Sequence, residues 1–188
     1  MKQPTMGDDD TLIHAGPAAP HPEAWGLPRG KHVSWHDPMA TAAYGATLSG
    51  REYLEAIRDG LLPPPPIANL MAMRLVALGD GEAFFCCEPD ESVYNPIGMV
   101  HGGLLCTLLD SAAGCAVHTQ LPAGVGYSTI EIKVSFLRPV HAGAGELEVR
   151  GRVVRAGRRV VFAEAEARDT TGRLVGQATT SVLVVGAA

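Results

Sequence analysis

The stretch NPIGMVHGGLLCTLLDSAAG, residues 95–114, decides the fold of this 188-residue chain. It places His101, the glycine pair Gly102-Gly103 and a single acidic residue, Asp110, in a run that is otherwise mostly small or apolar. At about 100° per residue, five residues share one helical face: Gly103, Cys106, Asp110, Gly114 and Val117. Leucines and alanines fill the other faces. A helix that is apolar nearly all round must be enclosed by other elements, so the sequence predicts a long central helix that begins near His101.

The sequences on both sides of this helix predict antiparallel strands. MAMRLVALG and EAFFCCEP precede it and are joined by the turn at 79–81. STIEIKVSFL follows it and alternates, which places Ile130, Ile132, Val134 and Phe136 on one face and Thr129, Glu131, Lys133 and Ser135 on the other. GELEVRGRVVRA, RVVFAEAEARD and RLVGQATTSVLVV then suit consecutive hairpins. We expect an α+β fold in which a curved antiparallel sheet wraps around the central helix.

The chain upstream of these strands divides into two further segments. Residues 1–48 are rich in Pro, Gly, Ala and His without sustained periodicity, so we expect an irregular N-terminal arm. SGRE is a capping box, with Ser49 as the N-cap and Glu52 at the third helical position. We therefore expect a capping helix and Pro-rich linker over 49–66, and the main domain over 67–186.

Composition excludes several classes of partner. The net charge of −5 does not favour nucleic acid or an anionic membrane surface. No apolar run approaches the roughly 18 residues that a membrane span needs, and the first residues lack the apolar core of a signal peptide. The four cysteines form no C-x-x-C pair, which favours free thiols in a reducing cytoplasm over disulfides or a metal site. We expect no metal and no cofactor.

Asp110 and the start of the helix are the candidate chemical groups. An unpaired buried carboxylate costs several kcal/mol, so Asp110 is either a structural residue bonded to a strand or a working carboxylate. At Gly102 and Gly103 the first-turn N–H groups are unpaired and lie at the positive end of the helix dipole. A ligand can approach a glycine backbone closely, which is the requirement for binding an oxyanion. His101 is a base or a cap, and the capping role is favoured.

The spacing of these groups implies two chains. Gly102 and Asp110 are eight residues apart, about 12 Å along a helix axis. One carbonyl carbon cannot contact both. Two such helices antiparallel across a two-fold axis would place Gly102 of one chain opposite Asp110 of the other. A single sheet layer also leaves the far side of the helix open, so we expect a homodimer with composite sites.

The chain resembles the PaaI-type hotdog-fold acyl-CoA thioesterases, within the 4-hydroxybenzoyl-CoA thioesterase-like superfamily. The motifs that carry the resemblance are residues 95–114, STIEIKVSFLRPV and the segment from GRRVVFAEAEARD to SVLV. The resemblance implies that Asp110 is a general base or nucleophile and that the Gly102 N–H is the oxyanion donor. It implies that Asn95 holds the thioester carbonyl or the water, and that Thr129 orients the water or the carboxylate from the partner chain. It further implies dimers or dimers of dimers.

The expected substrate is an acyl-CoA, with an aryl or medium-chain acyl group implied by the resemblance. Because arginine pairs well with phosphate, Arg158 and Arg159 at a hairpin tip are candidate contacts for coenzyme A, with Gly103, Arg138 and Lys133 as further candidates. Arg150 and Arg152 equally fit the solvent face of a strand. The acyl pocket is expected to draw on the helix at 49–61, the Cys106 face and the strand at 71–78.

Two other functions compete with the thioesterase hypothesis. A hotdog hydratase acting on enoyl-CoA would carry a histidine five residues after its aspartate, and Cys115 stands at that position. A non-catalytic acyl-CoA-binding protein has no need of a buried carboxylate opposite an oxyanion site. Hydrolysis of an acyl-CoA thioester to the free acid and CoA is therefore the favoured function.

Overall fold

The computed structural model describes residues 21–186. These residues divide into two units, 21–32 and 33–186, and each is described by itself. The first contains one short 3-10 helix, η1 (Pro22–Trp25). The elements of the second are α1 (Pro38–Gly45), α2 (Gly50–Arg58), α3 (Pro66–Leu70), β1 (Met73–Gly79), β2 (Glu82–Cys87), η2 (Glu91–Val93), α4 (Gly102–His118), β3 (Gly126–Phe136), β4 (Leu147–Arg155), β5 (Val160–Arg168) and β6 (Leu174–Val185).

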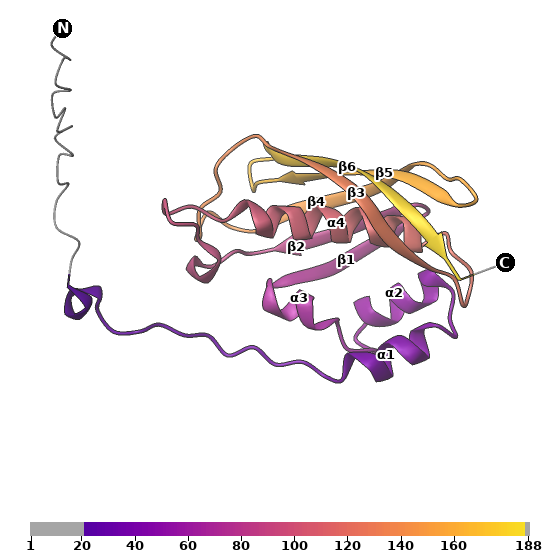
Figure 1. Cartoon of the computed structure of the whole chain (residues 1–188), viewed down its shortest axis with the longest axis horizontal. Helices are drawn as coiled ribbons and strands as arrows, with labels where there is room; N and C mark the ends of the chain where they lie inside the picture. The colour runs from indigo at the N-terminus through magenta and orange to yellow at the C-terminus, as the bar shows by residue number, and fades with distance from the viewer. Residues whose placement is uncertain (1–20, 187–188) are drawn as a thin grey trace, which may run out of the picture. The chain divides into compact units, whose positions relative to one another are not determined.

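The predicted α+β hotdog arrangement is confirmed. One six-stranded antiparallel sheet has the order β1-β2-β4-β5-β6-β3 and curves around α4, which lies across its concave face (Figure 1). The predicted hairpins from β4 to β6 are present, with Val149 opposite Ala167 and Ala165 opposite Ala178. β3 does not pair with β4, which follows it in the chain, but lies at the sheet edge beside β6.

Small residues let α4 approach the sheet closely. Three of the four buried inward positions of β5 are alanines, Ala163, Ala165 and Ala167, and this strand packs against α4. Opposite them on β4, a Cβ added to Gly151 would collide with the backbone carbonyl of Ala112. The helix is therefore seated on the sheet at backbone distance, and the larger core residues, among them Leu108 and Leu109, fill the space beside this contact.

The N-terminal helices cover the β1 edge of this layer. The predicted capping box is present: the Ser49 hydroxyl accepts from the Glu52 N–H, and the Glu52 carboxylate accepts from the Ser49 N–H. α2 and α3 pack against β1, and the Gly50 N–H donates to the Leu121 carbonyl beyond α4 at 2.9 Å. The helix α1, which the sequence analysis did not predict, begins at Pro38 after an Asp37 side chain that accepts from the Met39 N–H.

A β-bulge corrects the predicted faces of β3. The pairing of β3 with β6 shifts register between Thr129 and Glu131, so Ile130 is an extra residue and is 59% exposed. Ile132 and Val134 face the core as predicted. The simple alternation had predicted that Thr129 shares a face with Glu131. Because of the extra residue, Thr129 instead lies on the face of β3 that is turned toward α4, together with Ile132 and Val134.

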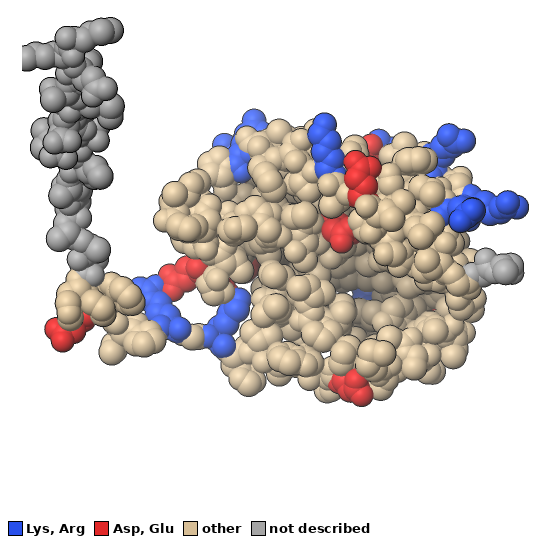
Figure 2. Space-filling model, viewed as in Figure 1, with Lys and Arg blue, Asp and Glu red and all other residues tan. Residues whose placement is uncertain are grey.

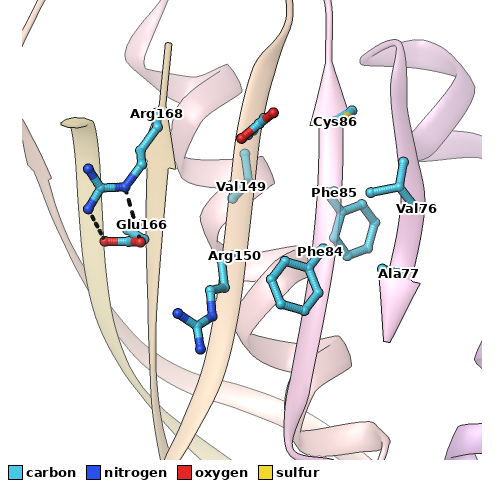
Figure 3. A pocket seen from close by; sticks show the side chains of 10 residues that line it. Val76, Ala77, Phe84, Phe85, Cys86, Val149, Arg150, Glu166 and Arg168 are labelled. Atoms are coloured by element: carbon cyan, nitrogen blue, oxygen red, sulfur yellow. Dashed lines mark hydrogen bonds and ion pairs between the residues drawn. The ribbon is translucent and has the colours of Figure 1, made fainter. Parts of the chain in front are cut away.

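The convex face of the sheet carries paired charges. Arg150 forms an ion pair with Glu82 and lies over the Phe84 ring at 5.7 Å, while Arg168 bonds Glu166 at 2.9 Å. A shallow hollow of about 350 Å³ lies among these side chains and Val76, Ala77 and Cys86 (Figure 3). Arg152 pairs with Glu164 in the same way. Arg150 and Arg152 therefore belong to the solvent face of the sheet, the simpler of the two interpretations.

Candidate active site

Asp110 opens into a hollow beneath the N-terminal helices. This Asp110 hollow has a volume of about 700 Å³, and its walls come from α2, the Pro-rich segment, β1, β2, α4 and β3. Figure 2 shows the surface hollowed between the central layer and α2 and α3, with few charged side chains around it. The residues used below are Tyr53, Leu54, Ile57, Met73, Leu75, Phe85, Asp110, Cys115, His118, Tyr127 and Thr129.

Thr129 fixes the carboxylate of Asp110 within one chain. The Thr129 hydroxyl donates to Asp110 Oδ1 at 2.9 Å, and both side chains are half-buried. This contact depends on the β-bulge, which turns Thr129 toward the helix. In the part of the chain that the structure describes, Asp110 Oδ2 has no hydrogen-bond partner, so it is the oxygen left to contact a ligand or water.

A second hollow, of about 660 Å³, lies at the N-terminus of α4. We call it the Gly102 hollow, and it is lined by Asn95, Met99, Val100, His101, Gly102, Gly103, Leu105 and residues 136–140. The predicted site residues that line it are Asn95, His101, Gly102, Gly103 and Arg138. The Arg138 guanidinium donates to the Leu174 carbonyl at 2.5 Å. The two hollows share no lining residue, so Gly102 and Asp110 of one chain line different hollows.

Each residue at the start of α4 has a defined role in that hollow. His101 Nδ1 accepts from the Gly103 N–H at 2.8 Å, so His101 is the N-cap, the role the sequence favoured. A Cβ on Gly103 would lie 2.9 Å from that nitrogen, which accounts for the second glycine. The Gly102 N–H is left without an acceptor among residues 21–186, since a first-position N–H has none within a helix.

Asn95 organises the loop that leads into α4. Its Oδ1 accepts from the N–H groups of Ile97 and Met99, each at 3.1 Å. The side-chain amide of Asn95 keeps its N–H donors for a ligand in the Gly102 hollow. Phe136 closes the other side, because a Cβ on Gly102 would lie 3.0 Å from the Phe136 Cζ.

Some predicted site residues lie elsewhere. Arg158 and Arg159, at the β4–β5 tip, line neither hollow, and the Arg159 carbonyl accepts from Val184 near the end of β6. Arg158 and Arg159 lie at the end of the sheet where β3 begins. Arg138 lies at the opposite end, just after β3 ends. Lys133 faces a separate hollow on the convex side, and Cys106 lines neither hollow.

The sequence analysis missed the far end of the Asp110 hollow. His118 lies eight residues after Asp110, on the same side of α4, and its ring is 5.3 Å from Tyr127 and 5.9 Å from Tyr53. Burial lowers the pKa of His118 and raises the pKa of Cys115 to about 12. The i, i+4, i+8 spacing of Asp110, Gly114 and His118 is the signal that could have identified the histidine.

Metal ligation has no obvious place in this arrangement. Residues 21–186 contain no group of three His, Cys, Asp or Glu side chains placed to hold a metal ion.

No helix among the described residues is both long enough and apolar enough to cross a membrane.

Fold and site together define a hotdog-fold protein of the thioesterase class, and the comparisons agree. Residues 97–176 match the model of the Thioesterase superfamily. The crystal structure of a phenylacetic acid degradation-related protein from Ralstonia eutropha JMP134 is 31% identical and has a TM-score of 0.64; the match covers 70% of this chain and 98% of that one. The chain therefore belongs to the thioesterase superfamily.

Two further relatives support the same placement. A mutant form of the phenylacetic acid degradation protein PaaI from Thermus thermophilus is 28% identical with a TM-score of 0.58, over 63% of this chain and 98% of that one. Acyl-coenzyme A thioesterase 13 of Mus musculus is 28% identical over 89 residues, which are 47% of this chain and 62% of that protein. The predicted PaaI-type family is thus confirmed.

Proposed function

We propose that the protein hydrolyses an acyl-CoA thioester to the free acid and CoA at a site shared by two chains. Asp110 of one chain acts as general base or nucleophile, and the Gly102 N–H of the partner subunit stabilises the oxyanion. The observation that carries this proposal is the separation of the two hollows within one chain, each holding half of the required groups.

The free edge of β3 supports the shared site. No strand of the described chain pairs with the outer edge of β3, and Ile130 and Phe136 on this strand are more than half exposed. Phe136 lies against Gly102, and Thr129 bonds Asp110. Antiparallel pairing with a second β3, centred on residue 133, therefore sets Phe136 of one chain opposite Thr129 of the other, because Ile130 is the extra residue of the bulge, and aligns unlike hollows.

The same pairing accounts for the predicted coenzyme A contacts. It brings the sheet end that carries Arg158 and Arg159 of one chain to the end that carries Arg138 of the other. Guanidinium groups from both chains then stand near one composite site, where they can pair with the phosphates of CoA. Assembly of two such dimers into a tetramer is compatible with this arrangement.

The chemistry needs only groups that the chain supplies. Water adds to the thioester carbonyl as Asp110 takes its proton, and negative charge develops on the carbonyl oxygen facing the Gly102 N–H. The C–S bond then breaks, and CoA leaves as the thiol after protonation. In the alternative route Asp110 attacks the carbonyl carbon, CoA leaves as the thiol, and water hydrolyses the resulting anhydride at the Asp110 carbonyl carbon. A single turnover in oxygen-18 water separates the routes, because only the second places the label in the Asp110 carboxylate.

The direct test is release of free thiol from a panel of aliphatic and aryl acyl-CoA thioesters. We expect release by the wild-type protein and its loss in Asp110→Asn. Binding of acyl-CoA without release from any member of the panel would instead identify a non-catalytic acyl-CoA-binding protein. None of the four cysteines, all within residues 21–186, forms a disulfide, which supports the proposal that the protein works in the reducing cytoplasm.

A further inference from the structure

Three rings form a polar cluster at the far end of the Asp110 hollow. The ring of His118 on α4 meets that of Tyr53 on α2 edge to face, with centroids 5.9 Å apart and an interplanar angle of 66°. It is tilted at 59° to the ring of Tyr127 on β3, with centroids 5.3 Å apart. Asp110 and His118 are eight residues apart on α4, about 12 Å along the helix axis. The hollow thus has a carboxylate at one end and this ring cluster at the other.

Close contacts with glycines hold the rings of the cluster. A Cβ on Gly114 would lie 2.7 Å from Tyr127 Cε2. A Cβ on Gly45 would collide with the Tyr53 ring, and one on Gly50 would collide with His118. Each ring therefore packs directly against the backbone of a glycine. This packing fixes the positions of the polar atoms before any ligand binds.

The polar atoms of two of these rings have no hydrogen-bond partner among the described residues. The Tyr127 hydroxyl interacts with the Cys115 thiol, but no hydrogen bond within residues 21–186 reaches the Tyr53 hydroxyl or the ring nitrogens of His118. No fully buried side-chain nitrogen or oxygen in that range lacks a partner, so these atoms are accessible, and both residues line the hollow. Burial lowers the pKa of His118, so its ring is neutral at neutral pH and offers one donor and one acceptor.

The walls between the two polar ends are mainly apolar, formed by Leu54, Ile57, Met73, Leu75 and Phe85. Arg58 and Arg74 also line the hollow, and their guanidinium groups are ion-paired with Asp59 and Glu146. An apolar wall selects by size, whereas positioned donors and acceptors discriminate strongly against a ligand that leaves them unpaired. A ligand that satisfies the whole hollow is apolar along its length and carries a hydrogen-bonding group at its far end.

We propose that Tyr53 and His118 determine specificity by binding a neutral hydrogen-bonding group, a hydroxyl or oxo group, on the acyl portion remote from the thioester. This inference rests on the proposed function, since it takes the Asp110 hollow as the acyl site. Tyr53 lies on α2, outside the segment that matches the family model, whereas His118 lies within that segment.

The test compares matched pairs of straight-chain acyl-CoA and ω-hydroxyacyl-CoA of increasing length. Dissociation constants are measured by calorimetry on Asp110→Asn protein, so the result does not depend on turnover. We expect a chain length at which the hydroxylated partner binds more tightly. Tyr53→Phe in the same background should reduce this preference about 2–12-fold, the range for one hydrogen bond between neutral groups, and His118→Phe should reduce it similarly.

Tyr44→Phe is the matched control, because Tyr44 lies on α1, is 56% exposed and does not line the hollow. It should leave the preference unchanged. Equal binding of both partners at every length would overturn the inference, as would tighter binding of ω-carboxyacyl-CoA than of the hydroxyl form. Equal weakening of both partners by Tyr53→Phe would assign Tyr53 a packing role only and would also overturn it. Absence of thiol release by the wild-type protein, with the binding preference intact, would count against the proposed function alone.

Discussion

Replacing Thr129 by valine removes the hydroxyl that holds Asp110 and keeps the shape of the side chain. The lost hydrogen bond is 2.9 Å long and its acceptor is a carboxylate. Hydrogen bonds to charged groups contribute about 1.5–3 kcal/mol. Since each 1.36 kcal/mol is a factor of ten in rate, we expect kcat/KM to fall about 10–150-fold.

The assay is the initial rate of thiol release from the best acyl-CoA of the panel, at substrate concentrations well below KM. Thr129→Ser keeps the donor and should retain most of the activity. Thr179→Val, on the exposed convex face of β6, is the matched control and should behave as wild type. A Thr129→Val protein with wild-type kcat/KM and unchanged Tm would refute the positioning role of Thr129, and so would an equal loss in Thr129→Ser.

Three further outcomes follow from the packing and the protonation states. Gly151→Ala should force α4 away from β4, which costs about 1–3 kcal/mol and lowers Tm by about 2–12 °C, whereas Gly30→Ala, with open space around it, should not. Because burial lowers the pKa of His118, the unfolded chain takes up its proton first; the free energy of unfolding in urea should fall as pH drops below about 6.5, and less so in His118→Phe. Cys115, with a pKa of about 12, should resist alkylation at pH 8 in the native protein and react once it is unfolded, as read by mass spectrometry.

The periodic elements were predictable because their signals are local. The capping box at Ser49, the helix after His101 and the strand alternation each depend on residues within one or two turns of one another. The spacing argument for Gly102 and Asp110 also needs only the rise of a helix. These features account for the central layer and for the division of the site into two halves.

The remaining features depend on contacts between distant segments. Pairing of β3 with β6 joins residues about 50 positions apart, and the bulge at Ile130 that turns Thr129 inward arises only in that pairing. Nothing in the strand alternation marks it. The ring cluster likewise needs α2 docked on α4, which requires Gly50 to pack against the His118 backbone. The helix α1 did leave a local signal, the Asp37-Pro38 start, that the compositional interpretation of the arm overlooked.

Complementation between two inactive chains tests the shared site most directly. Gly102→Pro removes the oxyanion N–H at the first helical position, where proline is tolerated, and Asp110→Asn removes the carboxylate. Each homodimer should be inactive. The purified heterodimer contains one site with both changes and one wild-type site, so we predict about half of the wild-type activity per dimer. A heterodimer as inactive as its parents would show that Gly102 and Asp110 do not act across two chains.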